Sequence, residues 1–137
     1  MATYNKFNSF VEAVAEKVHN LGSDQLVIAL CATANAPVAG NTKLSDLTQI
    51  SYTNLSSRNI TTTSSAQTSG TYKLTLNDLV LTASGAVAPF QYVVVYNDTA
   101  TNDELIAWFD YGSAVTLASG DTFTIDFDGS NGFLQIA

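Results

Sequence analysis

From Thr71 onward, short apolar segments alternate with turn residues, and this pattern constrains the fold more than any other feature. Thr71–Leu76 is TYKLTL and Gln91–Tyr96 is QYVVVY, and both compositions are typical of β-strands. The same pattern predicts five further strands, which are Leu79–Ala83, Glu104–Tyr111, Ala114–Leu117, Thr122–Phe127 and Phe133–Ile136. Strands at this spacing predict a mainly β fold, an antiparallel β-sandwich that is jelly-roll-like or has another sandwich topology.

The N-terminal segment has a helical period instead. Its apolar residues recur every three or four positions, with Phe10 beside them, and they are Tyr4, Phe7, Val11, Val14, Val18 and Leu21. This spacing predicts one amphipathic helix over residues 4–20, with Thr3 as a cap and Gly22 just past its end. We expect residues 1–22 to pack on the domain or on a partner, and residues 23–137 to form the sandwich, as a single domain overall.

The segment between the helix and the strands of the second half is more mixed. Gln25–Cys31 is nearly continuous in apolar residues and predicts a buried strand. Leu44–Ile50 has the pattern of one or two helical turns, with Asn41 or Thr42 as a cap. Residues 51–70 are rich in Ser, Thr and Asn. They are compatible with an edge strand near Arg58–Thr63, or with a loop that orders against a partner.

The charge is low and unevenly distributed. Only 12% of the 137 residues are charged, about half the usual share, and the net charge is −7. No Lys or Arg follows Lys73, whereas residues 74–137 hold eight acids, which are Asp78, Asp98, Asp103, Glu104, Asp110, Asp121, Asp126 and Asp128. Contact with nucleic acid or with an anionic membrane needs basic residues, so we expect neither as a partner. The acidic half favours solubility or attraction to a basic protein.

The usual signs of export and of disulfide bonding are missing from the sequence. The first residues, MATYNKFNSF, are polar, and no apolar run approaches the roughly 20 residues that span a bilayer. Cys31 is the only cysteine, so it has no intrachain partner, and we expect it to be an inert core thiol. We therefore expect synthesis in the cytoplasm.

The segment Asp126–Gly132, DFDGSNG, invites comparison with a calcium loop. An EF-hand loop that began at Asp126 would need Gly at its sixth position and Glu at its twelfth. The chain has Asn131 and Ala137 at those positions. We therefore interpret the segment as the turn of a hairpin between Thr122–Phe127 and the last strand, and we expect no metal and no cofactor.

Catalytic motifs are also missing from the sequence. The only histidine is His19, Cys31 has no histidine near it in sequence, and no phosphate-binding or metalloprotease motif occurs. Asp103, Glu104 and Asp110 resemble a glycosidase pair in residue type only, because the alternation places Glu104 and Asp110 at the two ends of a strand and Asp103 in a loop, as solvated charges of a hairpin. We therefore expect no enzymatic activity.

Four aromatic residues leave two interpretations open. Trp108, Tyr92, Tyr96 and Tyr111 are compatible with a sugar-stacking platform on a β-sandwich. Both faces of their strands are apolar, however, which favours a core or a subunit interface.

Several stretches together resemble small structural proteins of tailed bacteriophages. These stretches are NKFNSFVEAVAEKVHNLGSD, APFQYVVVYNDT, LIAWFDYG and FTIDFDGSNG, and the resemblance is weakest over residues 51–70. Proteins of this kind are most similar to head decoration, or cement, proteins. The resemblance implies a small β-rich protein that is added to the outside of the capsid, usually as a dimer or trimer, and bridges neighbouring capsomers. It brings no catalytic motif and no family site residue.

These observations lead to three functional hypotheses. The first is a non-enzymatic capsid cement protein on the virion surface, with the major capsid protein and other copies of itself as partners. The second is a tail or neck structural protein, and the third is a carbohydrate-binding module for adsorption to the host. As contact residues we predict the helix face, with Phe7, Phe10, Val11 and Val14, and the 51–70 segment, with Arg58.

Overall fold

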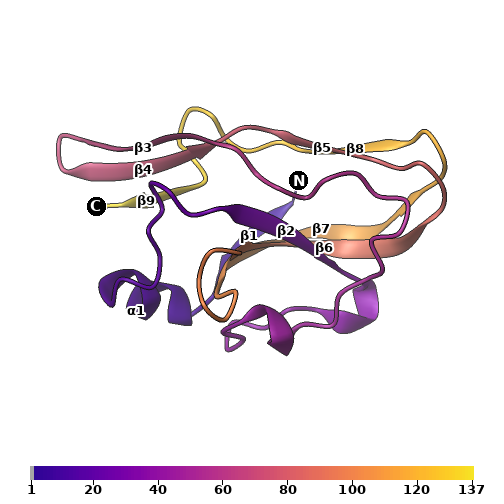
Figure 1. Ribbon diagram of the computed structural model, residues 1–137, viewed down its shortest axis with the longest axis horizontal. Coiled ribbons are helices and arrows are strands. Elements are labelled where there is room, and N and C mark those ends of the chain that lie inside the picture. Colours follow the sequence, from indigo (N-terminus) through magenta and orange to yellow (C-terminus); the bar gives the residue numbers. More distant parts are fainter. Residues whose placement is uncertain (1) are drawn as a thin grey trace.

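Two antiparallel layers face each other in the computed structural model, which describes residues 2–137 (Figure 1). The first layer has the strand order β1-β7-β6-β2, with β1 Thr3–Lys6, β7 Leu105–Leu117, β6 Val87–Asn97 and β2 Leu26–Cys31. The second layer contains β3 Thr62–Thr68, β4 Thr71–Leu76, β9 Leu134–Ile136, β5 Leu79–Thr82 and β8 Thr122–Ile125. The predicted mainly β, antiparallel, sandwich-like fold with one α-helix is confirmed, and the sheets do not close into a barrel.

The chain from β4 to β9 is one long antiparallel ribbon that folds over on itself. In the first layer Val94 faces Trp108, and in the second layer Leu79 faces Ile125 and Leu74 faces Leu134. The two arms stay bonded at the bend, where the Ala83 N–H donates to Asp121 at 2.9 Å. Both layers are therefore built from the same pair of arms, and the bend brings one face of the ribbon against itself (Figure 1).

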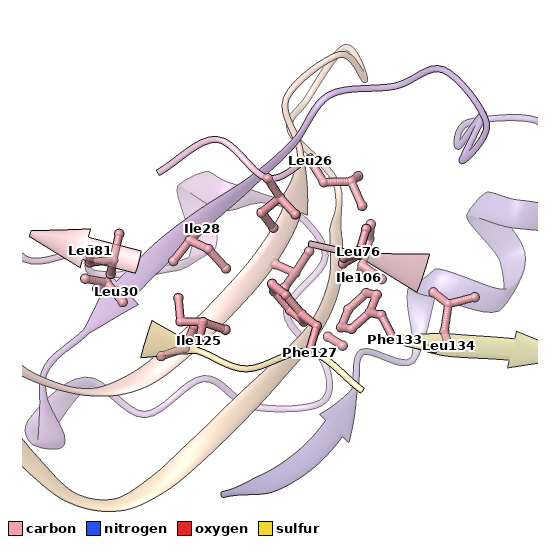
Figure 2. Packing of buried hydrophobic residues seen from close by; sticks show 14 of the residues in the cluster. Leu26, Ile28, Leu30, Leu76, Leu81, Ile106, Ile125, Phe127, Phe133 and Leu134 are labelled. Carbon is pink, nitrogen blue, oxygen red and sulfur yellow. The ribbon is translucent and has the colours of Figure 1, made fainter. Parts of the chain in front are cut away.

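The main core lies between the two layers. Figure 2 shows Ile28 and Leu30 of β2 on the same side of this core as Leu81 of β5 and Ile125 of β8, with Ile106 of β7 farther along the same core. These five side chains are all buried, and Ile28, Leu30, Ile106 and Leu81 are fully inaccessible to solvent. Their burial explains the alternation in the second-layer strands, because only one face of those strands is covered.

A second, smaller core lies on the other face of the first layer. Its buried residues are Phe7, Val27, Ala29, Cys31, Val94, Tyr96, Leu105 and Trp108, and Leu44 and Leu47 pack against it. In Figure 1 the short helices η1 Thr33–Asn35 and η2 Leu44–Asp46 lie on this side, away from the second layer. Because β2 is covered on both faces, all six of its residues are buried, which explains its continuous apolar sequence.

The N-terminal segment differs from the prediction. Residues 4–20 do not form one helix, since β1 pairs with β7 before α1 Ser9–Ala15 begins. Tyr4 lies opposite Phe109, and Phe7 is fully buried with its ring 4.5 Å from that of Trp108. Pairing with β7 and the burial of Phe7 against Trp108 override the local helical spacing.

The helix also ends earlier than predicted. Lys17 takes the left-handed conformation with φ of 66°, and the Val18 N–H donates back to the Ala13 carbonyl at 2.8 Å. This closing pattern is the one that helices use at their C-termini, so Gly22 is not needed as a cap. Phe10 of α1 belongs to the main core together with Leu26 and Ile106.

Three strand predictions need correction. The strand in residues 51–70 is Thr62–Thr68 and does not begin near Arg58, and residues 114–117 continue β7 as part of one long strand. The last two strands are not a hairpin, because β8 pairs with β5 whereas β9 pairs with β4. Residues 126–133 form a loop instead. This loop interrupts the pairing between the two arms of the ribbon, opposite residues 75–78.

Gly132 fixes this loop against the ribbon, which leads to a stability prediction. Its φ is +82°, and an added Cβ would lie 2.6 Å from Lys73 Cγ and 2.8 Å from the Leu74 carbonyl oxygen. We expect Gly132→Ala to lower the free energy of unfolding by about 1–3 kcal/mol in urea denaturation. Gly129→Ala in the same loop is the control, because nothing lies within 4 Å of its added Cβ. Equal losses in the two variants would contradict this role of Gly132.

Candidate functional site

One long side of the sandwich is open. β1 pairs only with residues 107–110 of β7, so residues 111–117 have no neighbouring strand on that side within the described chain. In the second layer β8 pairs with β5 and with no other strand of the described residues. A cavity of about 520 Å³ lies between these two edges, and we refer to it as the β7–β8 groove. Its lining residues are Ala2, Val93, Phe109, Tyr111, Thr122, Phe123, Thr124, Ile125 and Asp126.

Aromatic side chains give the groove a rigid apolar wall. Tyr111 is 48% exposed, and its ring meets that of Phe123 edge-on at 5.6 Å. Phe123 in turn meets Phe90 edge-on at 5.2 Å, and Phe90 is fully buried. An exposed ring that rests on a buried one loses little further freedom when a ligand covers it, which is the property of a good binding anchor.

The surroundings of the groove are acidic or neutral. Asp126 lines it, and residues 74–137, which supply β7 and β8, contain no Lys or Arg. Asp110 is already engaged, since its Oδ1 accepts hydrogen bonds from Gln91 Nε2 at 3.0 Å and from the Gly112 N–H at 2.8 Å. The groove therefore suits an apolar segment that is neutral or basic at its ends.

The predicted helix-face contact residues do not form one surface. Phe7 and Phe10, which were predicted as partner contacts, are buried within their own chain, with 0% and 5% exposure. Val14 is half-buried against the main core, and Val11 is 55% exposed. The apolar face of this segment is used mainly for intramolecular packing, and Val11 alone of the four presents most of its side chain to solvent.

Arg58 covers the free edge of β2. Its guanidinium donates to the Ile28 carbonyl and lies 3.7 Å over the ring of Tyr52. Its own carbonyl accepts the Ile28 N–H at 3.0 Å, and the Ile60 N–H donates to Leu26 at 2.9 Å. Segment 58–60 thus acts as a short irregular strand along β2, and the Arg58 side chain makes an intramolecular contact with that strand.

A buried polar cluster lies at the base of the β6–β7 turn. Asn97 is fully buried, its Oδ1 accepts the N–H groups of Thr99 and Ala100, and its Nδ2 donates to Asp24 at 2.6 Å. The same Nδ2 lies 3.0 Å from Nδ1 of His19, which therefore acts as the acceptor and leaves the proton on Nε2. The sequence gives little sign of this cluster, although Asn97 does end a strand before a turn.

Burial controls the protonation of this histidine. His19 is 7% exposed, and desolvation lowers its pKa, against the opposing charges of Glu104 and Asp24. Its Nε2 is buried and has no hydrogen-bond partner among the described residues. The ring is 5.5 Å from that of Phe10, so the neutral imidazole acts as a core side chain.

The acidic candidates are not brought together as a catalytic pair. Glu104 accepts hydrogen bonds from Asn102, whereas Asp110 lies six residues along the same strand, roughly 20 Å away at the usual rise. Burial raises the pKa of Asp103, helped by the charges of Asp98 and Glu104. The separation does not fit the carboxylate distances of either glycosidase class.

The Asp126–Gly132 segment is a turn that satisfies its own carboxylate. Asp128 Oδ1 accepts the N–H groups of Ser130 and Asn131, both at 2.8 Å, and Oδ2 accepts Asn131 Nδ2 at 2.8 Å. These hydrogen bonds, led by those from Asn131, lower the pKa of Asp128. Across residues 2–137 no three His, Cys, Asp or Glu side chains lie close enough to hold a metal ion.

The predicted aromatic platform is dispersed. Trp108 and Tyr96 are buried in the smaller core, Tyr92 is half-buried and packs against it, and only Tyr111 of the four is exposed. Cys31 lies in the same core, and burial raises its pKa to about 11. The core interpretation of these aromatics is thus correct for Trp108 and Tyr96, whereas Tyr111 belongs to the groove.

Comparisons with protein-family models, with curated proteins and with solved structures found no match for this chain. Within the described residues, no helix is long and apolar enough to cross a membrane. The functional argument therefore rests on the geometry of the groove and of the sheet edges.

The buried imidazole predicts a pH-dependent stability. The folded-state pKa of His19 lies below the unfolded value of about 6.5, so the unfolded chain binds this proton first as the pH falls. Stability should be full above about pH 6.5 and should decline as the pH falls towards the folded-state pKa. We expect a lower urea midpoint at about pH 5.5 than at about pH 7.5. His19→Gln should lose most of that difference, because His19 is the only histidine. An equal pH dependence in the variant would contradict the neutral buried state.

Proposed function

We propose that this chain is a non-enzymatic decoration protein of a bacteriophage capsid, which binds the outer surface and stabilises capsomer junctions. We further propose that the β7–β8 groove receives an extended segment of the major capsid protein. The observation that carries the proposal is the unpaired edge of residues 111–117 beside a rigid aromatic groove. An edge of this kind is suited to binding an added strand.

An added strand would bind in two ways at once. Its main chain would pair with the free edge of β7, which supplies affinity independent of sequence. Alternate side chains would point into the groove against Tyr111 and Phe123, which supply apolar contact. The acidic residues near the groove would favour a strand flanked by basic residues.

The charge distribution supports a position on the outside of a DNA-filled shell. The half of the chain that supplies β4 to β9 holds a single base, Lys73, and eight acids, so packaged DNA would repel it. A cement protein needs only modest affinity at each contact, because the contact is repeated over the whole shell and the contributions add. Chains of this type would be made in the host cytoplasm and would act on the assembled virion.

The same features suit a tail or neck structural protein, and the position on the particle separates the two alternatives. A carbohydrate-binding module is less well supported, because Trp108 and Tyr96 are buried and leave no exposed stacking platform. We therefore retain capsid decoration as the proposal and the tail or neck location as the outcome that would replace it.

The location is tested by electron microscopy of intact particles of the encoding phage with a gold-labelled antibody against this chain. We expect label over the whole head, because a cement protein occupies many equivalent sites. Label confined to the tail or neck would replace the decoration proposal with the tail alternative. Particles that carry no label would contradict both structural roles.

The groove is tested by removing its exposed anchor. We expect Tyr111→Ala to weaken binding to capsids that lack the protein by at least about tenfold, as for a central aromatic contact. The measurement is co-sedimentation of purified chain with those capsids. Val38→Ala is the matched control, since Val38 is 58% exposed but lies outside the groove, and it should bind like the wild type. Equal binding by the two variants would leave head labelling intact but would exclude the groove as the contact surface.

A further inference from the structure

The second layer ends in a free edge at β3. This strand, Thr62–Thr68, is bonded to β4 on one side and has no strand on its other side within residues 2–137. The hairpin that joins it to β4 is tight, because Ser69 and Gly70 both take positive φ, 52° and 86°. Two such residues form a turn of type I′, which fixes the register of the two strands.

This register shows which main-chain groups point outward. Thr68 and Thr71 close the turn as a hydrogen-bonded pair, so Thr68 and every second residue before it bond to β4. Ser65 and Gln67 alternate with these residues, so they direct their N–H and C=O groups away from β4. No segment outside β4 bonds to these groups in the part of the chain that the structure describes.

The edge lacks the usual protection against pairing. Natural edge strands are commonly blocked by charged side chains or by proline, and none occurs from Asn59 to Tyr72. Most residues of β3 are exposed, so burial does not explain why the strand lacks charged residues. Two copies with a net charge of −7 repel each other, and this repulsion is weakest where the facing surfaces are neutral. The β3 edge is such a neutral surface.

We propose that β3 pairs with β3 of a second copy, antiparallel, about a two-fold axis beside Ala66. In this register Ser65 of each copy exchanges both main-chain hydrogen bonds with Gln67 of the other, so all four outward groups of each chain are satisfied. The outer face then places Ala66 against Ala66 and Ser64 against Thr68. Small side chains and Ser–Thr pairs are favourable at these positions, and no like charges meet.

The pairing is closed, since each copy has one β3 edge and the dimer uses both. It joins the two three-stranded sheets into one continuous six-stranded sheet. The inference does not depend on capsid binding. If the capsid proposal holds, the dimer carries two β7–β8 grooves and would tie together two capsid segments with higher avidity than one chain.

Cysteine cross-linking tests the axis directly. Across a two-fold the Ala66 Cα atoms would be about 4.5 Å apart, within the range that a disulfide spans. We expect Ala66→Cys to give a two-chain band on a non-reducing gel after mild oxidation and to lose it with reductant. The native Cys31 does not interfere, because it is buried and its pKa is raised to about 11. Val38→Cys, at an exposed position outside both free sheet edges, is the control and should stay a single chain.

A mixing experiment tests the register. Ser64→Cys and Thr68→Cys should each fail to cross-link alone, whereas an equal mixture of the two should cross-link. Wild-type protein should show in sedimentation a mass that rises towards two chains with concentration. The proposal is overturned if Ala66→Cys cross-links no better than Val38→Cys. It is also overturned if Ser64→Cys alone links as well as the mixture, or if the wild type stays a single chain at every concentration.

Discussion

The folding of one β-ribbon onto itself is the constraint on which the rest of this structure depends. The two arms, β4–β6 and β7–β9, remain bonded to each other through the bend at Ala83 and Asp121. Apolar side chains on one face of the ribbon meet between the two layers. Each Å² of apolar surface buried in this way stabilises the closed form by about 25 cal/mol. β2 joins the first layer beside β6, and α1 and the 3₁₀ segments then cover what the ribbon leaves exposed. The open side with the β7–β8 groove is a direct result, because a folded ribbon has two unpaired long edges.

The sequence predicted those elements whose period is set by burial. β2 and β4 match their predicted ranges closely, since a continuous apolar run and a strict alternation each admit one interpretation. The prediction of one helix over residues 4–20 failed because Tyr4 and Phe7 have helical spacing but contact β7 and Trp108, which lie about a hundred positions away. The prediction of a β8–β9 hairpin failed for a similar reason, since each strand pairs with a strand 40 to 64 positions earlier. Short-range patterns carry no information about such distant partners.

The candidate site was less predictable than the fold. The groove combines Val93, Tyr111 and Phe123 from three strands, and only the bend of the ribbon brings them together. Tyr111 was recognised as one of four unusual aromatics, but its separation from the buried Trp108 depends on where β1 stops along β7. Asn97 and His19 are 78 positions apart, so their contact has no local signature. Arg58 was predicted as a contact with a partner, and in the structure its guanidinium donates to a carbonyl of its own chain.

The treatment of the sheet edges carries the strongest argument about function. The edge of β2 is closed by segment 58–60, with a guanidinium placed on the Ile28 carbonyl. Within residues 2–137, no strand covers the edges of β7 at 111–117 and of β3 at 62–68, and neither stretch contains a charged residue. Unprotected edges promote uncontrolled association, and natural proteins usually block or cover them. The two edges differ in a way that suits two different partners. The β7 edge adjoins an apolar, acidic-rimmed groove that favours a different chain, whereas the small, neutral side chains of β3 are compatible with their own symmetry copies. One strand would then set how many copies assemble, and the other would set where the assembly attaches.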